Sequence, residues 1–447
     1  MPIEAGQDAA PMGRLAGLRS RLDIPLLAAA VATSGVKVAS AALNYLFLIL
    51  LARLMTVDGF GLYGVLFSAA TLAAAVLTFG QPVFVLKSIP QFEALKDEAR
   101  KKGVLLFGLR VLAGTSLVFL LVLGGAYEMR LLPSSLLVSG VLVAFALLTL
   151  VYAFSDYACN VLRALGHAYA GLVPRDIAWR LLTCVGVVVL ARYGEVSLLN
   201  VLLLLAVTLV VLVGWQARRI GGLILRMKPV LPVVETGNWA KASTWMAIGS
   251  LLYVASMTVD TVIVGATLGA EDAAIYFAAA RTAAMSSLLL VGLRLIAAPV
   301  FAKLHYGAEP EALRARIEMV YGLSAVTALA LGVLGYLLAP YIIQLFGADY
   351  AEGVTPFRIL LIGLAVATAG GMSASILEST GGERLNALVL LATQSATALA
   401  IVFGALNAGL YGAAIAKAAG VAIEALILTA CVFYRLRSGA PKGVGTA

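Results

Sequence analysis

Charged side chains inside apolar stretches are the residues of this chain whose types and spacing could do chemistry. Cations outnumber anions there: the cations are Lys37, Arg110, Arg175, Arg180, Arg281, Arg294 and Lys417, and the anions are Asp176, Asp260 and Glu424. A charge at the centre of a bilayer costs about 2.5–3.5 kcal/mol on insertion scales, so most such residues face a cavity or a partner. The surplus of positive charge fits an anionic ligand, such as a phosphate group, better than an organic cation.

Two apolar segments carry polar residues on one helical face. Lys37, Ser40 and Asn44 follow i, i+3, i+7 spacing, which predicts a polar stripe that lines a cavity. The alternative is that Lys37 extends to the nearby membrane interface, about 9 Å away at 1.5 Å per residue. Lys417 and Glu424 also share a face. They form either a structural ion pair or a site for substrate or a proton.

Further ion pairs are predicted between and within these segments. Asp260 and Arg281 lie at similar depth in adjacent segments, where they form either a pair that breaks during transport or a permanent structural pair. Asp176 and Arg180 are four residues apart, which favours a local pair on one helix, while Arg175 points elsewhere and is expected to be free.

The composition places these charges in a membrane protein. The chain has 447 residues, of which 62% are hydrophobic and 12% are charged, whereas a soluble domain carries about 25% charged residues. This composition excludes an ordinary cytosolic enzyme, a disordered protein and a secreted module. A spanning helix needs about 20 mostly apolar residues. The expected fold class is an all-α integral membrane protein with twelve transmembrane helices, at about 31–54, 60–85, 103–126, 135–156, 168–191, 196–214, 243–268, 272–302, 318–346, 355–377, 385–406 and 409–433.

Basic residues predict the orientation of these helices. Most Lys and Arg residues outside the helices flank them on one side, and the other side holds Arg53, Arg130, Arg192 and Arg358. The positive-inside rule then places both termini in the cytoplasm. The net charge of +9 is explained by inner loops that lie against anionic lipid headgroups, without nucleic acid. The predicted organisation is a cytoplasmic N-terminal segment (1–30), an N-lobe (31–214), a cytoplasmic linker (215–242), a C-lobe (243–434) and a cytoplasmic tail (435–447).

The two lobes are predicted to be parallel repeats. Residues 52–63, which join the first two spans, align with residues 266–276, which join the seventh and eighth, at Ala, Leu, Asp and Tyr positions. Residues 82–84 and 299–301 share the sequence Pro-Val-Phe. Because each half holds six spans, both halves enter the membrane in the same direction. The two six-helix lobes would then be related by a pseudo-twofold axis along the membrane normal.

Sequence patterns for cofactors and catalysis are missing. Cys159, Cys184 and Cys431 have no CxxC spacing and are expected to be small membrane-buried residues, and His167 and His305 stand alone. No Walker A pattern occurs, and no loop outside the membrane is long enough for a catalytic domain. We therefore expect no cofactor, no metal site and no enzymatic activity. A membrane-embedded transferase is a remote alternative.

Two segments resemble signatures of a known family. Leu51-Ala-Arg-Leu-Met-Thr-Val-Asp-Gly-Phe-Gly-Leu-Tyr63 is similar to the segment that follows the first helix of polysaccharide exporters, the Wzx-type flippases of lipid-linked oligosaccharides. Asp260-Thr-Val-Ile-Val-Gly-Ala-Thr-Leu-Gly269, followed by Tyr276, is similar to their seventh-span signature. The resemblance covers about residues 30–435. It implies the superfamily that also contains multidrug and toxin extruders and lipid II flippases, and twelve spans favour its polysaccharide branch.

The resemblance implies a flippase that moves a polyprenyl-diphosphate-linked oligosaccharide to the outer leaflet of the bacterial inner membrane, by alternating access through a cationic cavity. The expected partners are this lipid-linked glycan, membrane lipids and a polysaccharide polymerase or other assembly protein. An ion-coupled multidrug or metabolite antiporter with the same fold is the alternative. The expected substrate-binding residues are Lys37, Asn44, Arg175, Arg180, Arg281 and Lys417, and the expected gating or coupling residues are Arg53, Asp260 and Glu424.

Overall fold

The computed structural model describes residues 24–438, apart from 139, 287–296, 298–299, 302–303 and 305–309, with side chains from residue 35 to residue 436 except at 134, 135 and 310. The secondary structure of these described residues is helical, with short turns between the helices. Several residues of the sequence analysis lie outside the described residues. They are Arg294, His305, residues 1–23 of the predicted N-terminal segment and residues 439–447 of the predicted tail.

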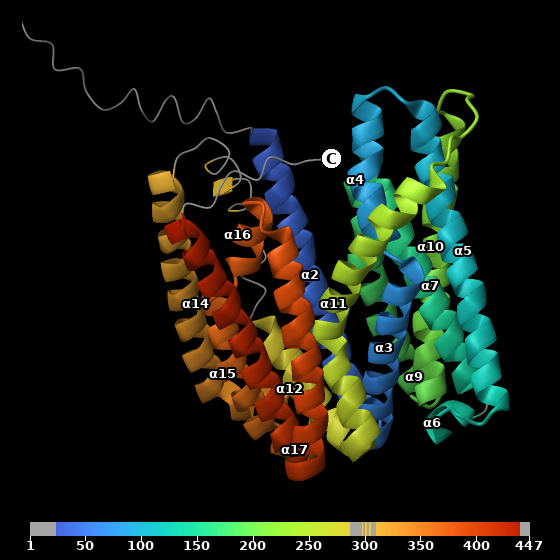
Figure 1. The fold of residues 1–447 in the computed structure, drawn as a ribbon. Coiled ribbons are helices and arrows are strands. Elements are labelled where there is room, and N and C mark those ends of the chain that lie inside the picture. Colours follow the sequence, from blue (N-terminus) through green and yellow to red (C-terminus); the bar gives the residue numbers. More distant parts are fainter. Residues whose placement is uncertain are drawn as a thin grey trace, which may run out of the picture.

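The first half of the chain forms helices that run back and forth between the two ends of the molecule (Figure 1). One crossing, α3–α4, breaks at Phe79 and Gly80, which both have left-handed backbone conformations. Another crossing, α8–η1–α9, continues through a π-helical turn. The elements are α2 (Ile24–Leu54), α3 (Val57–Thr78), α4 (Gln81–Ala94), α5 (Glu98–Glu128), α6 (Ser134–Leu137), α7 (Val141–Ala164), α8 (Ala168–Val173), η1 (Pro174–Ala178), α9 (Trp179–Tyr193) and α10 (Leu198–Leu225).

The second half follows the same pattern. Its last element, α17, consists of two crossings that meet at a kink, where Ala408 and Gly409 leave the helical conformation. The elements are α11 (Thr236–Leu268), α12 (Ala270–Met285), α14 (Pro310–Gln344), the 3-10 helix η2 (Ala348–Gly353), α15 (Val354–Ala369), α16 (Ser373–Ser379) and α17 (Glu383–Ser438).

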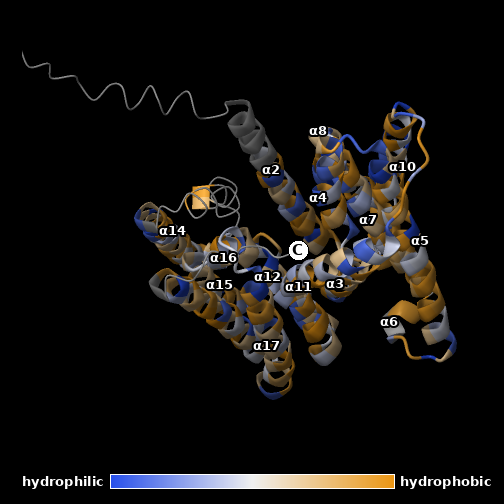
Figure 2. Cartoon of the chain, turned by 45° about the horizontal axis from the view of Figure 1, so that its top comes forward, coloured by the Kyte–Doolittle hydropathy of each residue, from blue (hydrophilic) through white to orange (hydrophobic). Residues whose placement is uncertain are grey.

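These elements confirm the predicted fold class. Nine of the described helical segments are long and apolar enough to cross a membrane. One of them, α17, crosses twice, and the α8–η1–α9 crossing and the crossing that begins with α12 bring the total to twelve. Hydrophobic residues predominate along the helices, while hydrophilic residues gather at the ends of α4, α8 and α10 (Figure 2). The described chain is thus an all-α membrane protein with two lobes of six crossings.

The helix ends follow local capping rules. Thr56 begins α3, because its hydroxyl oxygen accepts a hydrogen bond of 3.1 Å from the backbone N–H of Gly59. Asp97 begins α5 in the same way, at 2.9 Å from the N–H of Arg100. Between the lobes, α10 continues to Leu225 and α11 begins at Thr236, so 226–235 is the non-helical connection. The domain boundaries derived from the sequence stay a prediction.

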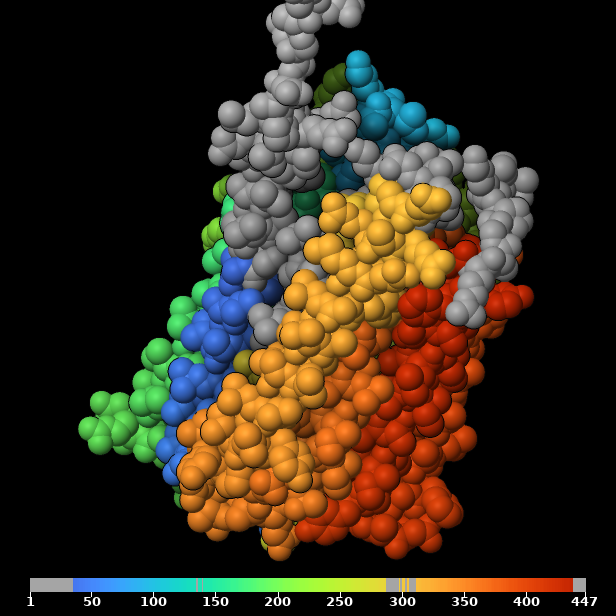
Figure 3. Space-filling view, turned by 90° about the vertical axis from the view of Figure 1, so that its left-hand side faces the viewer, coloured from blue at the N-terminus to red at the C-terminus, as the bar shows by residue number. Residues whose placement is uncertain are grey.

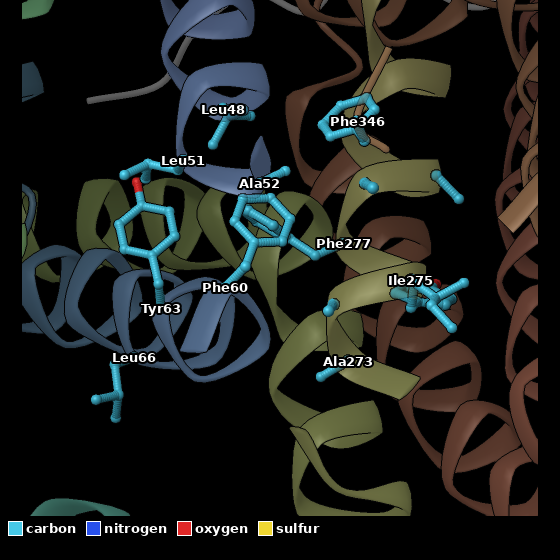
Figure 4. Close-up of a cluster of buried hydrophobic side chains, with 14 of the residues drawn as sticks. Leu48, Leu51, Ala52, Phe60, Tyr63, Leu66, Ala273, Ile275, Phe277 and Phe346 are labelled. Atoms are coloured by element: carbon cyan, nitrogen blue, oxygen red, sulfur yellow. The ribbon is translucent and has the colours of Figure 1, made fainter. Parts of the chain in front are cut away.

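Among the described residues, the largest hydrophobic core joins the two lobes at one end. There, a single core includes Phe60 of α3, Phe277 of α12 and Phe346 beyond α14 (Figure 4). We call this the closed end, and it lies at the bottom of Figure 1. At the opposite end each lobe has its own smaller core, one around Phe84 and the other around Ile317. We call that the basic end, because it carries Lys96, Arg100, Lys102, Arg226 and Lys228.

Helix α11 is the element that passes between the lobes. Its first turn packs on the N-lobe, where the Trp239 ring lies 5.7 Å from that of Phe107 and 6.0 Å from that of Phe84, measured between ring centroids. Its later turns contact α3, α12 and α17. Across the lobes, α2 contacts α12, and Figure 3 shows α2 (blue) beside the green helices of the first half.

Glycine permits the closest approach of the lobes. A Cβ atom at Gly61 of α3 would lie 1.8 Å from the carbonyl oxygen of Ala270, at the start of α12. A Cβ at Gly265 of α11 would lie 2.2 Å from the side chain of Val65. Both distances are far below van der Waals contact, and at Gly61 the close atom belongs to the backbone, so a larger residue there would force the lobes apart.

Gly61→Ala is expected to lower the midpoint of thermal unfolding, because forcing an extra methyl group into packed structure costs about 1–3 kcal/mol. Gly114→Ala is the matched control, since a Cβ at Gly114 of α5 meets no atom within 4 Å. The midpoints can be measured by scanning fluorimetry on purified protein in detergent. Equal midpoints for the two variants would contradict the backbone contact at Gly61.

Candidate functional site

A cavity of about 780 Å³ lies between the lobes. Its walls come from α2, α3, α4, α7, η1 and α9 of the first half and from α11 and α12 of the second. Tyr63 and Phe277 line it and also belong to the core of the closed end. Behind them, the ring of Phe60 lies 5.6 Å from that of Phe277 and 5.7 Å from that of Tyr350. This aromatic cluster therefore forms the floor of the cavity.

Five charged residues line the cavity, and two arginines among them have partners. Arg175 forms an ion pair with Asp156, and its guanidinium lies 5.0 Å from the centre of the Tyr152 ring. Arg163 donates a hydrogen bond of 2.8 Å to the side-chain oxygen of Asn160. These contacts reduce the ability of Arg175 and Arg163 to attract a further anion.

The other two arginines of the cavity, Arg180 and Arg281, have no ion-pair partner among the described carboxylates. The Arg180 guanidinium lies 4.4 Å from the Trp179 ring centre, and its buried Nη1 atom has no hydrogen-bond partner. Arg281 lies 5.0 Å from the Phe277 ring centre and donates a long hydrogen bond of 3.4 Å to Ser68. Both guanidinium groups interact electrostatically with Tyr63. Because both side chains line the same cavity, the arrangement offers two positive charges to an anion.

The π-helical turn η1 decides where the charges of the fifth crossing point. Pro174 opens this turn, and a π-helix has more residues per turn than an α-helix, so residues four apart no longer face the same side. Asp176 therefore pairs with Lys37 of α2 at 2.5 Å rather than with Arg180. The predicted Asp176–Arg180 pair is wrong, and so is the expectation that Arg175 is free.

A second cluster of charges lies in the C-lobe, outside the cavity lining. Lys417 of α17 lies 3.5 Å from the carboxylate of Asp260 on α11, and it donates a hydrogen bond of 2.6 Å to the carbonyl oxygen of Ser256. Tyr276 lies 3.3 Å from the same carboxylate and donates to it. The side chains of Lys417 and Asp260 are about nine-tenths buried.

This cluster corrects two further pairings. Asp260 forms its ion pair with Lys417, because the second half of α17 packs against α11, and it interacts with Arg281 electrostatically without an ion-pair contact. Glu424 does not pair with Lys417 either. Its Oε2 atom lies 2.9 Å from Thr393 and 2.6 Å from Gln394, both on the first half of α17. The two halves approach closely at Gly420, where a Cβ would lie 2.2 Å from the Thr397 hydroxyl.

Arg53 links the lobes at the closed end. It donates two hydrogen bonds of 2.8 Å, to the carbonyl oxygens of Gln344 and Leu345 at the end of α14. Carbonyl groups at a helix C-terminus lack partners within the helix and carry partial negative charge. Arg53 therefore satisfies these carbonyls from the opposite lobe. Its predicted gating role stays a prediction.

The structure brings together four of the predicted substrate-binding residues. Asn44, Arg175, Arg180 and Arg281 line the cavity, whereas Lys37 and Lys417 are absent from its lining, as are the predicted gating residues. Sequence reasoning assigned no role in the site to Tyr152, Asp156, Asn160 or Arg163, which also line the cavity. Their spacing of four, four and three places them on one face of a helix, and this regularity was the available signal.

Charged residues at the basic end hold the connection between the lobes. Arg100 lies 2.6 Å from Glu235, and the N–H of Val233 donates to the carbonyl oxygen of Ala99 at 3.0 Å. The hydrogen bond from the N–H of Arg100 holds the pKa of the Asp97 carboxyl below its ordinary value. Among the described residues, no group of three or more His, Cys, Asp or Glu side chains could hold a metal ion.

The fold is that of transporters of the MOP superfamily. One similar structure is the inward-facing conformation of a multidrug resistance MATE transporter, with a TM-score of 0.75, 14% identity and coverage of 89% of this chain and 95% of that chain. The outward-facing conformation of a multidrug resistance MATE transporter has a TM-score of 0.59 and 17% identity, and the match covers 92% of this chain and 96% of that chain. A third similar structure is a MOP superfamily transporter from Pyrococcus furiosus, with a TM-score of 0.65, 15% identity and coverage of 92% of this chain and 96% of that chain. That transporter is described as having a binding pocket of reverse polarity, which suggests a different function.

The family is defined by the sequence itself. A family model described as polysaccharide biosynthesis protein matches residues 26–305, which is more than half of the chain, and the chain belongs to this family. No protein of curated function matches the sequence. The polysaccharide family implied by the sequence signatures is therefore confirmed, and the fold is the one expected from that resemblance.

Lys417→Met is expected to destabilise the protein strongly, since removing one partner of a buried ion pair costs about 3–5 kcal/mol. Adding Asp260→Asn should recover much of the loss, because it removes the unpaired carboxylate. Lys241→Met is the control, since the Lys241 side chain is exposed near the start of α11. Thermal midpoints of the three variants test this, and a Lys417→Met midpoint equal to that of Lys241→Met would show that the Lys417–Asp260 pair is not a buried one.

Proposed function

We propose that the protein is a flippase that moves a polyprenyl-diphosphate-linked oligosaccharide from the cytoplasmic to the outer leaflet of a bacterial inner membrane. The observation that carries this proposal is the pair of arginines, Arg180 and Arg281, that line the cavity with no described carboxylate within ion-pair distance. Two buried guanidinium groups match the charge of one diphosphate. Arginine also binds phosphate oxygens in a bidentate geometry, which gives more strength and direction than lysine.

The rest of the cavity suits the other parts of such a substrate. Asn44, Asn160 and Thr71 supply hydrogen-bonding groups for sugar hydroxyls, and the rings of Tyr152 and Phe67 offer flat apolar surfaces. The polyprenyl chain remains in the bilayer throughout, so it is not exposed to water during transport. A membrane potential that is negative inside favours outward movement of the anion, by roughly 4–5 kcal/mol per 100 mV for two charges that cross the full field.

The packing supports alternating access that is open toward the basic end in this conformation. Because the lobes share a core at the closed end and have separate cores at the basic end, the cavity has its aromatic floor at the closed end. Opening the other way requires the Arg53 hydrogen bonds and the Phe60 cluster to separate. The positive-inside rule assigns the basic end to the cytoplasm, and with it both termini.

An organic-cation antiporter with the same fold is less well supported. Such a protein needs a carboxylate that is free to bind the cation, but Asp156 is the carboxylate in the cavity lining, and it is paired with Arg175. Asp260, in the C-lobe, is paired with Lys417. Neither side chain offers an uncompensated negative charge. We also propose that the protein carries out transport without catalysis.

In cells, deletion of the gene is expected to cause one polyprenyl-diphosphate oligosaccharide to accumulate, measured by mass spectrometry of a lipid extract. The wild-type gene should reverse the accumulation, whereas Arg180→Ala and Arg281→Ala should not. Arg110→Ala is the control, since Arg110 lies in α5 with an exposed side chain and outside the cavity lining. Normal lipid levels in the deletion strain, together with increased drug sensitivity, would instead favour the antiporter.

In vitro, the purified protein should bind farnesyl diphosphate, a short prenyl diphosphate probe. Arg180→Ala and Arg281→Ala should each weaken binding by roughly 10- to 100-fold, because a hydrogen bond to a charged group contributes about 1.5–3 kcal/mol. Microscale thermophoresis can measure the dissociation constants, with Arg110→Ala as the control. If farnesol binds as tightly as farnesyl diphosphate, the arginines do not recognise the phosphates.

A further inference from the structure

One carboxyl group in the interior of the C-lobe lies outside the cavity and outside every described ion pair. Glu424 is on the second half of α17, roughly 22 Å along the helix from the kink at Gly409 and about 14 Å from residue 433, where the predicted span ends. Because α17 folds back on itself at the kink (Figure 1), Glu424 contacts the first half of the same element. No described Lys or Arg lies within ion-pair distance of it.

The neighbours of Glu424 are two polar side chains from the first half of α17. Its Oε2 atom is 2.9 Å from Oγ1 of Thr393 and 2.6 Å from Nε2 of Gln394. The Thr393 hydroxyl also lies 2.8 Å from the carbonyl oxygen of Val389, one turn earlier in the helix. A hydroxyl has one hydrogen and two acceptor lone pairs. If that hydrogen is donated to Val389, the 2.9 Å contact needs a hydrogen on Glu424.

The electrostatic surroundings also favour a neutral carboxyl group. The charged group within electrostatic reach of Glu424 is Lys417, two turns away on the same helix. Lys417 is already held by Asp260 and by the carbonyl oxygen of Ser256. An ionised carboxylate in an apolar interior without its own cation is costly, and the group becomes neutral instead.

We propose that Glu424, Thr393 and Gln394 form a proton-binding site in the C-lobe. One proton binds to Oε2 of the Glu424 carboxylate, and the resulting neutral acid donates to Oγ1 of Thr393 while Thr393 donates to Val389. On release, the proton leaves to water, the Thr393 hydrogen turns to the carboxylate, and Gln394 continues to donate to it. The site is separate from the cavity, and the proposal stands whether or not the substrate is a lipid-linked oligosaccharide.

Infrared spectroscopy of the protein in lipid bilayers tests the site directly. The wild type at neutral pH should show a C=O stretching band from a hydrogen-bonded neutral carboxyl group. This band should be absent in Glu424→Gln, which keeps the shape and a neutral amide. It should persist in Glu383→Gln, an exposed position in the first turn of the same helix. The band should disappear as the pH is raised, because the bound proton is then released.

A second variant keeps the test decisive if Glu424→Gln fails to fold. Thr393→Val removes the acceptor of the Glu424 hydrogen bond with little change of volume, so the band should remain and move to higher wavenumber. Identical spectra for the wild type and Glu424→Gln would overturn the proposal. So would loss of the band at neutral pH when sodium chloride replaces choline chloride, since the site would then bind sodium. These spectra need no transport substrate, so their outcome is independent of the lipid accumulation in the deletion strain.

Discussion

The cost of leaving a charge unpaired in an apolar interior governs the arrangement of this protein. Three aspartates in the helices each have a cation on another crossing: Asp156 has Arg175, Asp176 has Lys37 and Asp260 has Lys417. Each pair joins two different crossings, so neutralising the charges also fixes how the helices pack. Arg180 and Arg281 line the cavity with no carboxylate within ion-pair distance, and this is the feature on which the proposal of an anionic substrate rests.

The sequence was sufficient for the fold because the fold depends on length and hydrophobicity. Each crossing needs about 20 apolar residues, and basic residues gather at one side of the membrane. Both signals give the same helix count and orientation even when a predicted helix boundary is wrong by a few residues. The pairing of charges is a different kind of property. Spacing along one α-helix predicted Asp176–Arg180 and left Lys417–Glu424 as one of two alternatives, but a π-helical turn changed the first pairing and packing between α11 and α17 changed the second. Contacts between helices cannot be read from the spacing within one helix.

The closed end and the cavity share residues. Tyr63 and Phe277 belong to the core that joins the lobes and also form the floor of the cavity. Gly61 brings α3 against the start of α12, and this contact places the two rings together. The segment that resembles the family signature thus contains both the glycine that allows the contact and the aromatic residues that seal it. The apolar residues of this segment therefore both pack in the shared core and close the cavity at this end.

The course of α11 has a consequence for how the chain can be divided. The internal repeat suggests two equivalent modules, and a cut between residues 226 and 235 would separate them in sequence. Yet the indole of Trp239, which follows that cut, fills a pocket made by Phe84, Phe92 and Phe107 of the first half. Fragments expressed separately would each carry an exposed part of this pocket. The two fragments would have to associate with Trp239 in this pocket. Each half therefore depends on the other for part of its packing.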